Sequence, residues 1–379
     1  MSIPFVDLGA QHAEIADEVR TGVEDVFART AFVAGAEVSL FEQEYAAYLG
    51  AGHCVGVANG TDALELALRG AGVRAGGEVI LPANTFIATA EAVSRIGAVP
   101  VLVDVDEEHL LIDPTRVEEK LGARTQAVVP VHLFGQAAPV DQVQALCADA
   151  GIPVVEDAAQ SQGARRHGMA AGTLGQAAAT SFYPGKNLGA AGDAGAVTTP
   201  DEALAARVRV LAAHGSPTRY RHDVIGMNSR LDTIQAVYLR AKLARLEKWN
   251  QLRRDAADRY AALLAGLEPA GLRLPRVAPG NEHVWHLYVV RVPERDRVLS
   301  GLAERGIGAG IHYPTPVHLT PAYAGLGQGP GTFPVAERAA GQILSLPMHP
   351  HLTIGQQEAV AQALAELLVP DGTGDGRQR

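Results

Sequence analysis

The feature that most constrains the fold is an alternation of short apolar segments with amphipathic segments in the first half of the chain. The apolar segments, rich in β-branched residues, are predicted to be strands, at residues 54–58, 78–81, 99–103, 127–131, 153–156 and 178–182. Helices are predicted between them at residues 63–68, 87–95, 117–121 and 140–150, and before them at 11–29 and 41–49. This order is typical of βαβ units, which build a mostly parallel sheet with helices on both faces. We therefore predict an α/β fold whose ligands gather at the carboxyl ends of the strands.

The second half of the chain has a different pattern. Residues 232–264 form a long run rich in Ala, Leu, Arg and Glu, which we interpret as one linking helix at a domain hinge. A strand at 286–292 and helices at 298–305 and 356–368 follow, and this order suits a smaller α+β domain. We predict domains 1–245 and 246–379, and we expect the polar tail, residues 370–379, to be frayed.

Composition excludes several classes of function. With 379 residues, 47% of them hydrophobic and 20% charged, the chain has the character of a well-packed soluble protein. Its net charge of −10 argues against nucleic acid or an anionic membrane as the main partner, because both need clustered Lys and Arg. The first ten residues lack a basic region leading into an apolar core, and no run of about 18 apolar residues occurs, so we expect neither a signal peptide nor a membrane span. Cys54 and Cys147 form no Cys-x-x-Cys pair, which fits a reducing cytoplasm without disulfides or a thiolate zinc site.

One lysine stands apart from the other charged residues. No other Lys or Arg lies between Arg166 and Arg207, and Lys186 is surrounded by small residues in the segment SFYPGKNLGAAG. A partly desolvated lysine loses its proton more readily and can attack a carbonyl, as it does with pyridoxal phosphate (PLP) or keto substrates. Taken alone, the commoner alternative is a solvated lysine on a surface loop.

Three other positions after predicted strands have both a functional and a structural interpretation. Asp157 directly follows a predicted strand, where it could cap the next helix or hold a pyridine nitrogen protonated. Gly60 and Thr61 lie in a turn between a strand and a helix, which could bind phosphate at the helix start or be an ordinary capped turn. Phe86 could stack on an aromatic cofactor, although most single aromatic residues after a strand belong to the core.

Several other kinds of site are not indicated. The histidines that invite a metal interpretation have spacings that fit no known zinc pattern, so we predict no metal; they are His132, His312, His318, His349 and His351. No G-x-S-x-G elbow, Walker loop or G-x-G-x-x-G fingerprint occurs in the strand–turn–helix context that it needs. Hydrolase, P-loop and nicotinamide chemistry are therefore not expected.

Four segments, taken in order, resemble the signature motifs of the sugar aminotransferases of the DegT/DnrJ/EryC1/StrS family. They are NGTDAL (59–64), EDAAQ (156–160), SFYPGKNLG (181–189) and NSRLDTIQA (228–236). The likeness extends to PFVDL (4–8) and HYPTPVHL (312–319), so it spans nearly the whole chain. The resemblance implies a fold type I PLP enzyme, with a large PLP-binding domain built on a mostly parallel mixed sheet and a smaller C-terminal α+β domain. It also implies a homodimer whose active sites lie at the subunit interface.

The resemblance also implies roles for individual residues. Lys186 matches the lysine that binds PLP covalently and then acts as the base, and Asp157 matches the partner of the pyridine nitrogen. The other matched positions are Gln160 near the PLP hydroxyl, Phe86 on the ring, and Gly60, Thr61, Ser181 and, from the neighbouring subunit, Asn228 on the phosphate. Tyr313 and His318 resemble positions on the substrate side.

The expected reaction is PLP-dependent transfer of an amino group from L-glutamate, which becomes 2-oxoglutarate, to a nucleotide-linked keto sugar. We favour a TDP-linked keto-6-deoxyhexose, and an amino sugar made for an antibiotic or another secondary metabolite. The run NSRLD (228–232) favours members that act on 3-keto sugars, with a 4-keto sugar as the alternative. A dehydratase is not expected, because histidine replaces the lysine in that branch. An alternative of another class is a PLP-binding regulator without catalysis.

Overall fold

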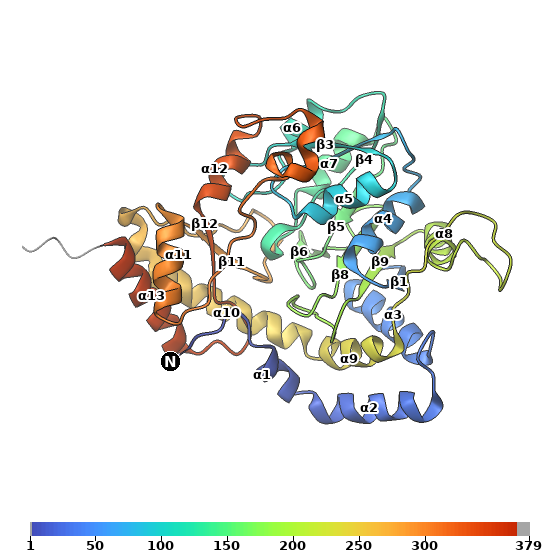
Figure 1. Ribbon diagram of the computed structural model, residues 1–379, viewed down its shortest axis with the longest axis horizontal. Helices are drawn as coiled ribbons and strands as arrows, with labels where there is room; N and C mark the ends of the chain where they lie inside the picture. Colours follow the sequence, from blue (N-terminus) through green and yellow to red (C-terminus); the bar gives the residue numbers. More distant parts are fainter. Residues whose placement is uncertain (1, 370–379) are drawn as a thin grey trace, which may run out of the picture.

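The computed structural model describes residues 2–369, so the expected frayed tail, 370–379, lies outside the described residues. Figure 1 shows a large body built around a mixed sheet and, beside it, a smaller group of elements made mainly from the C-terminal third of the chain. The segment in which the two meet contains α10 (Leu246–Leu264). The boundary at 245/246 stays a prediction.

The central sheet is mixed and mostly parallel, as the sequence predicts. Its strand order is β3 (Val99–Val103), β2 (Glu78–Pro82), β4 (Thr125–Val128), β5 (Val155–Asp157), β8 (Ala177–Ser181), β9 (Gly195–Thr199) and β1 (His53–Val57). The bridges Val128–Val154 and Val131–Asp157 join β4 to β5. The strands from β3 to β8 are parallel, whereas β9 runs antiparallel to both β8 and β1. The carboxyl ends of β5 and β8 therefore point to the same edge of the sheet.

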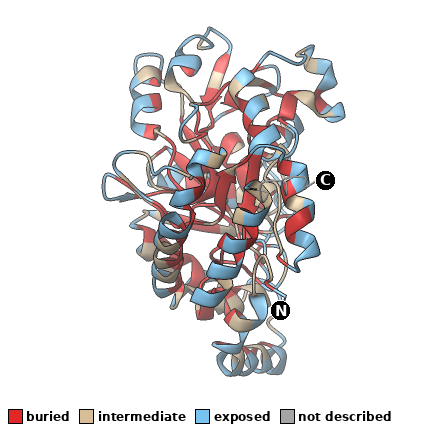
Figure 2. Ribbon diagram, turned by 90° about the vertical axis from the view of Figure 1, so that its left-hand side faces the viewer, coloured by how far each residue is buried: buried red, intermediate tan, exposed pale blue. Residues whose placement is uncertain are grey.

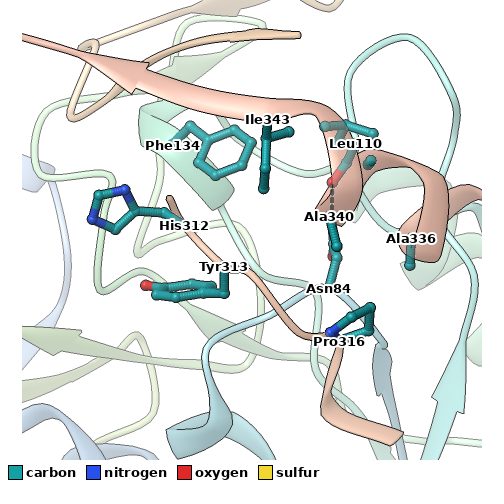
Figure 3. Close-up of a pocket in the computed structure, with 10 residues that line it drawn as sticks. Asn84, Leu110, Phe134, His312, Tyr313, Pro316, Ala336, Ala340 and Ile343 are labelled. Atoms are coloured by element: carbon teal, nitrogen blue, oxygen red, sulfur yellow. Dashed lines mark hydrogen bonds between the residues drawn. The ribbon is translucent and has the colours of Figure 1, made fainter. Parts of the chain in front are cut away.

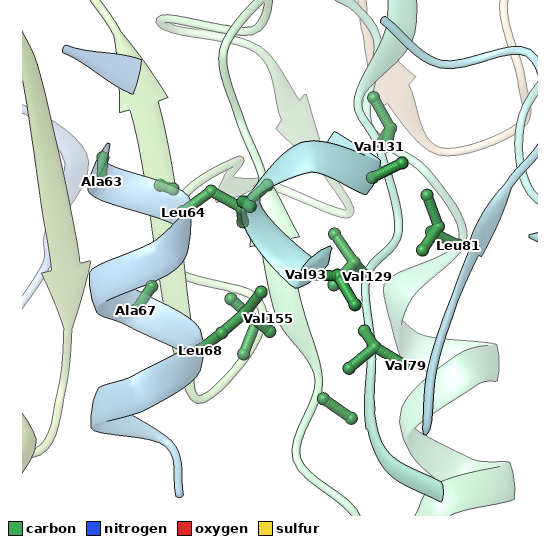
Figure 4. Close-up of a cluster of buried hydrophobic side chains, with 14 of the residues drawn as sticks. Ala63, Leu64, Ala67, Leu68, Val79, Leu81, Val93, Val129, Val131 and Val155 are labelled. Atoms are coloured by element: carbon green, nitrogen blue, oxygen red, sulfur yellow. The ribbon is translucent and has the colours of Figure 1, made fainter. Parts of the chain in front are cut away.

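Alternating side chains of the strands pack on the two faces of this sheet. On β2, Val79 and Leu81 join the core beneath α4 (Gly60–Gly70) and α5 (Ile87–Arg95), as Figure 4 shows. Ile80 faces the other way and packs in the core of α6 (Pro114–Glu118) and α7 (Val140–Cys147). The strands are buried in the interior, while the helices expose their outer surfaces (Figure 2). Because both faces of the sheet are covered, the sequences of these strands are continuous apolar runs.

Two of the long helices predicted from the sequence are each broken in two. The segment 11–29 forms α1 (Leu8–Ala13) and α2 (Ala16–Arg29), and the turn between them is held by Glu14, whose carboxylate accepts hydrogen bonds from Trp249 and His351. The segment 232–264 forms α9 (Thr233–Leu243) and α10. The break lets α9 pack on α2 and on α3 (Ala36–Leu49), while α10 packs on α13 (Ile354–Leu368).

The smaller group of elements has its own antiparallel pair, β11 (Tyr288–Arg291) and β12 (Ile343–Leu346). A core formed by α10, α11 (Arg295–Glu304) and α13 covers this pair. Ile3 forms a parallel bridge to Ile307, so the amino-terminal segment lies on this part of the molecule. The sequence reasoning missed several elements, namely β6 (Arg165–Arg166), β7 (Met169–Ala170), β9, α8 (Glu202–Ala212), β10 (Asn281–Glu282), α12 (Pro334–Gln342) and β12.

Candidate active site

A cavity with a volume of about 610 Å³ lies beside the central sheet, at the carboxyl ends of β5 and β8. Residues far apart in the sequence meet there. Eight of the ten residues to which the family resemblance assigns a role line it: Gly60, Thr61, Phe86, Asp157, Gln160, Ser181, Lys186 and Tyr313. This cavity is the candidate active site.

Lys186 lies on the connection between β8 and β9, residues 182–194, which we call the lysine loop. The loop turns sharply, because the Lys186 N–H donates to the Tyr183 carbonyl and the Ala190 N–H donates to the Phe182 carbonyl. Burial lowers the pKa of the Lys186 amine to about 8, and the Asp157 carboxylate opposes part of that shift. About one tenth of this amine is therefore unprotonated, and nucleophilic, at pH 7, far more than for a lysine with the ordinary pKa.

Asp157 is the last residue of β5, and its carboxylate is fixed from one side. Oδ2 accepts a hydrogen bond of 2.7 Å from Thr89 on α5, whose hydroxyl is also 2.7 Å from that of Thr85. Oδ1 has a longer contact, 3.2 Å, with the Ala159 N–H. The carboxylate thus keeps acceptor capacity on the side of the cavity, where it can hold a cationic nitrogen.

A narrow cradle lies where α4 begins. Asn59 caps the helix by accepting from the Asp62 N–H, at 2.8 Å. At Gly60 the helix lies so close to β8 that an added Cβ would be 2.5 Å from the Cβ of Ser181. The first N–H groups of a helix have no partner within it and attract anions, so the close approach sets these donors beside the Ser181 hydroxyl.

Gln160 and Tyr313 connect the two sides of the cavity. The Gln160 side chain accepts from the Phe134 N–H at 2.7 Å and donates to the Tyr313 hydroxyl at 3.0 Å. Burial and the nearby Asp157 raise the pKa of Tyr313, so its hydroxyl stays protonated. The Phe86 ring, half exposed, lies 5.0 Å from the Tyr313 ring between centroids. An aromatic wall therefore faces the acid at the strand end.

The other two residues to which the resemblance assigns a role lie elsewhere in this chain. The His318 side chain is fully buried, hydrogen-bonds Glu337 at 3.0 Å and packs on Phe333, so it does not line the cavity. Asn228 is exposed and also lies outside the lining, whereas the next residue, Ser229, is buried and accepts from the Ala58 N–H. The expectation that Asn228 serves a neighbouring subunit stays a prediction.

The cavity also has lining residues that the sequence reasoning did not assign to it. Four of them come from the amino-terminal segment and the last third of the chain: Phe5, Val6, His286 and His312. His312 stacks on Phe5 with 5.6 Å between ring centroids, and its Nδ1 is 2.8 Å from the Ser345 hydroxyl. Figure 3 shows His312 and Tyr313 on the same side of the segment that carries them. No sequence signal marks His286, because it follows Lys186 by about 100 residues at the edge of an ordinary apolar strand.

Comparison with known proteins assigns the chain to a family. The sequence pattern of the DegT/DnrJ/EryC1/StrS aminotransferase family matches residues 13–365. The chain belongs to this family. The resemblance stated from its motifs is thereby confirmed, as are the enzyme class, PLP-dependent aminotransferase, and the fold class, PLP fold type I.

Family members with closely similar sequences are known. The chain is 47% identical over 367 residues, 97% of its length and 99% of the relative's, to the erythromycin biosynthesis sensory transduction protein EryC1 of Saccharopolyspora erythraea. It is also 47% identical, over 96% of both chains, to the dTDP-3-amino-3,4,6-trideoxy-alpha-D-glucose transaminase of Streptomyces venezuelae. The crystal structure of S. venezuelae DesV in complex with a ketimine intermediate superposes with a TM-score of 0.94 at 47% identity, covering 97% of this chain and 99% of that one.

The cavity fits the PLP that this family uses. The close approach at Gly60 leaves helix-start N–H groups beside Ser181, which suits a phosphate, and the free side of Asp157 suits a protonated pyridine nitrogen. The lowered pKa of Lys186 suits a lysine that binds a carbonyl carbon. Three features at separate points of the cavity thus match three parts of one planar cofactor.

Within residues 2–369, no group of three or more His, Cys, Asp or Glu side chains could hold a metal ion. None of the helices in the described part of the chain is long and apolar enough to cross a membrane.

Proposed function

We propose that this aminotransferase transfers the amino group of L-glutamate to a TDP-linked 3-keto-6-deoxyhexose and so makes an amino sugar for secondary metabolism. The observation that carries the proposal is the meeting of Lys186 and Asp157 in a cavity of about 610 Å³ that also holds the helix-start cradle. This volume lies within the usual range for small-molecule sites and leaves room for a substrate beside a cofactor.

Each residue would have a separate task. Lys186 would hold the cofactor covalently and, once its amine is free, move a proton to and from the substrate carbon. Asp157 would hold a proton on the pyridine nitrogen, and Thr89 would keep the Asp157 carboxylate in place through the bond of 2.7 Å. When bound, PLP supplies the electron sink and the temporary carrier of the amino group.

The remaining residues would bind and orient. Gly60, Thr61 and Ser181 would hold the phosphate, and Gln160 would contact the ring hydroxyl. Phe86 and Tyr313 would cover the reacting carbon and keep water away from it, which favours proton transfer to the intended atom. We do not extend the substrate role to His318, because its bond to Glu337 keeps it out of the cavity.

The choice of sugar follows from relatives and from one motif. The S. venezuelae transaminase takes its name from a 3-amino sugar product. The run NSRLD (228–232) of this chain agrees with that name, because it too favours 3-keto substrates. A 4-keto substrate is the second candidate. We also propose a homodimer in which exposed Asn228 reaches the phosphate in the neighbouring subunit, which gives a reason for its absence from the cavity of its own chain.

One experiment tests the reaction and its position on the sugar. The purified protein would be incubated with PLP, L-glutamate and either TDP-3-keto- or TDP-4-keto-6-deoxyglucose, and the product would be identified by mass spectrometry and NMR. We expect amination of the 3-keto sugar and formation of 2-oxoglutarate, with no product from Lys186→Ala. Amination of the 4-keto sugar alone would select the second candidate.

The name of EryC1 as a sensory transduction protein keeps a regulatory alternative worth testing. A PLP-binding regulator without catalysis would bind PLP yet leave L-glutamate unchanged. Adding L-glutamate alone should convert the bound cofactor to its amino form and release one equivalent of 2-oxoglutarate if the protein is an enzyme. No conversion of L-glutamate would favour the regulator.

A further inference from the structure

His286 lies in the wall of the active-site cavity, and nothing in the proposed scheme uses it. It precedes β11, on the side of the cavity formed by the smaller group of elements. Its Nδ1 is 3.2 Å from Oδ1 of Asn187, the residue that follows Lys186 in the lysine loop. His286, from a remote part of the sequence, is thus hydrogen-bonded to the residue next to the reactive lysine.

The proton on the His286 ring can be assigned from a chain of hydrogen bonds that begins at backbone carbonyls. Asn250 on α10 donates its amide to the Gln162 carbonyl, at 2.9 Å, so its Oδ1 is free to accept. The Asn187 amide nitrogen donates to that Oδ1 at 2.9 Å and to the Val284 carbonyl at 3.0 Å. Since both donors of Asn187 are used in this way, its oxygen must accept from His286, whose Nδ1 therefore carries a hydrogen.

A neutral imidazole with a hydrogen on Nδ1 has a lone pair on Nε2. In the described residues, Nε2 of His286 has no protein partner, and it is not among the buried unpaired atoms, so it is open to the cavity. Burial and, after it, the charge of nearby Lys186 hold the pKa of His286 well below its usual value. The ring therefore stays neutral and offers an acceptor, not a donor, to the cavity.

The groups around this ring explain why it stays neutral. They are Lys186 on the lysine loop, Arg253 on α10, His312 across the cavity wall and His283 on the segment of His286 itself. The Asp157 carboxylate raises the pKa of Lys186, against the effect of burial. Because these neighbours of the histidine are basic, a second proton on the His286 ring would put a positive charge close to other positive charges.

We propose that His286 is a positioning residue for Lys186: fixed as the Nδ1–H tautomer by Asn187, it offers Nε2 as a hydrogen-bond acceptor to the Lys186 amine whenever that amine is free. This rests on the proposed role of Lys186 in binding the cofactor. The bond would hold the amine near the reacting carbon during the interval in which the substrate has displaced it. It would also favour the ammonium form, so that it raises the pKa of Lys186 above the value that burial alone would give.

Two substitutions separate the proposed acceptor on Nε2 of His286 from the hydrogen bond that Nδ1 makes to Asn187. His286→Asn keeps an amide N–H at the position of Nδ1, so it retains the bond to Asn187 but withdraws the acceptor from the cavity. His286→Gln is longer and can return an amide oxygen to the position of Nε2. A merely structural role would be served at least as well by the asparagine as by the glutamine.

The decisive measurement is the pH dependence of PLP capture by the cofactor-free full chain, followed by absorbance in a stopped-flow instrument. Capture needs the unprotonated amine, so the rate of the wild type should rise through the pKa of Lys186, about 8. In His286→Asn the midpoint should fall by about one pH unit, a tenfold change in the acid constant, and His286→Gln should restore it. A midpoint that is unchanged or raised in His286→Asn would overturn the proposal.

Steady-state kinetics give a second readout. His286→Asn should lower kcat about 10-fold and leave the KM values for both substrates within about threefold, because the lost bond is made only to the freed amine. Equal losses in His286→Asn and His286→Gln would contradict the proposal. Lys186→Ala separates this test from the proposed function: if that variant still captures PLP covalently, the assignment of Lys186 itself fails, whatever His286 does.

Discussion

Adding one methyl group at Gly60 tests the phosphate cradle directly. The Cβ of Gly60→Ala would lie 2.5 Å from the Cβ of Ser181 and 3.1 Å from its Cα. Ordinary carbon contacts are about 3.5 Å, so the start of α4 and the end of β8 must separate by about 1 Å. Rotation of the Ser181 side chain cannot relieve the clash, because its Cα and Cβ are fixed by the strand.

The cost follows from the geometry of hydrogen bonds. A contact of about 2.9 Å that lengthens by this amount is no longer a hydrogen bond, and bonds to a charged group contribute about 1.5–3 kcal/mol each. Loss of one or two of them amounts to about 3 kcal/mol, which predicts that PLP binds about 100-fold more weakly. The assay is an absorbance titration of the cofactor-free protein with PLP.

Gly185→Ala provides the matched control in the same cavity. Its added Cβ would have the Tyr183 ring, at 3.7 Å, as its nearest contact, so little has to move. We expect its Kd for PLP to stay within about threefold of the wild type. The reasoning would be refuted by a Gly60→Ala protein that binds PLP as tightly as the wild type, or by equal weakening in the two variants.

Three further predictions use other contacts. Lys186→Ala should lose the absorbance of covalently bound PLP and turnover together, and retention of either would count against the assignment. The pKa of Lys186 falls from 10.5 to about 8 on folding of the cofactor-free chain, so the unfolded chain binds more protons than the folded chain between pH 8 and 10.5. Urea titrations should therefore show the free energy of unfolding of the wild type rising over this pH window relative to that of Lys186→Met. The same pH dependence in both proteins would contradict the lowered pKa. Glu156→Gln should lower the free energy of unfolding by about 3 kcal/mol, because the buried carboxylate accepts hydrogen bonds from His132 and from three backbone N–H groups. The control Glu282→Gln, at an exposed position, should change the free energy of unfolding by less than about 0.5 kcal/mol.

Sequence patterns located the parallel part of the fold well, for a physical reason. Strands such as β2 are buried on both faces, so they appear as runs of apolar residues that are easy to recognise. The breaks at Glu14 and Arg245 were missed because they depend on which neighbours each helix packs against, and the 3.6-residue period continues across them. The strand β9 escaped notice because it directly follows a glycine-rich loop that has no strand signal.

The candidate site shows the same division. Lys186 and Asp157 could be brought together from the sequence because Asp157 ends a strand and Lys186 follows one, and parallel topology places such positions at one edge of the sheet. The phosphate role of Gly60 stays a prediction, and the sequence reasoning was wrong to place this residue in a separate turn, because it is the first residue of α4. His286 and the burial of His318 could not be predicted, because both depend on contacts between the smaller group of elements and the rest of the chain.

The path of the amino-terminal segment has a practical consequence for handling the protein. Within five residues the chain leaves its bridge to Ile307, contributes Phe5 and Val6 to the cavity and reaches Asp7, which caps α1. Trimming residues 2–6 to aid crystallisation would therefore remove Phe5, against which His312 stacks. A preparation shortened there would report on a damaged enzyme, and low turnover measured with it would say little about the natural substrate.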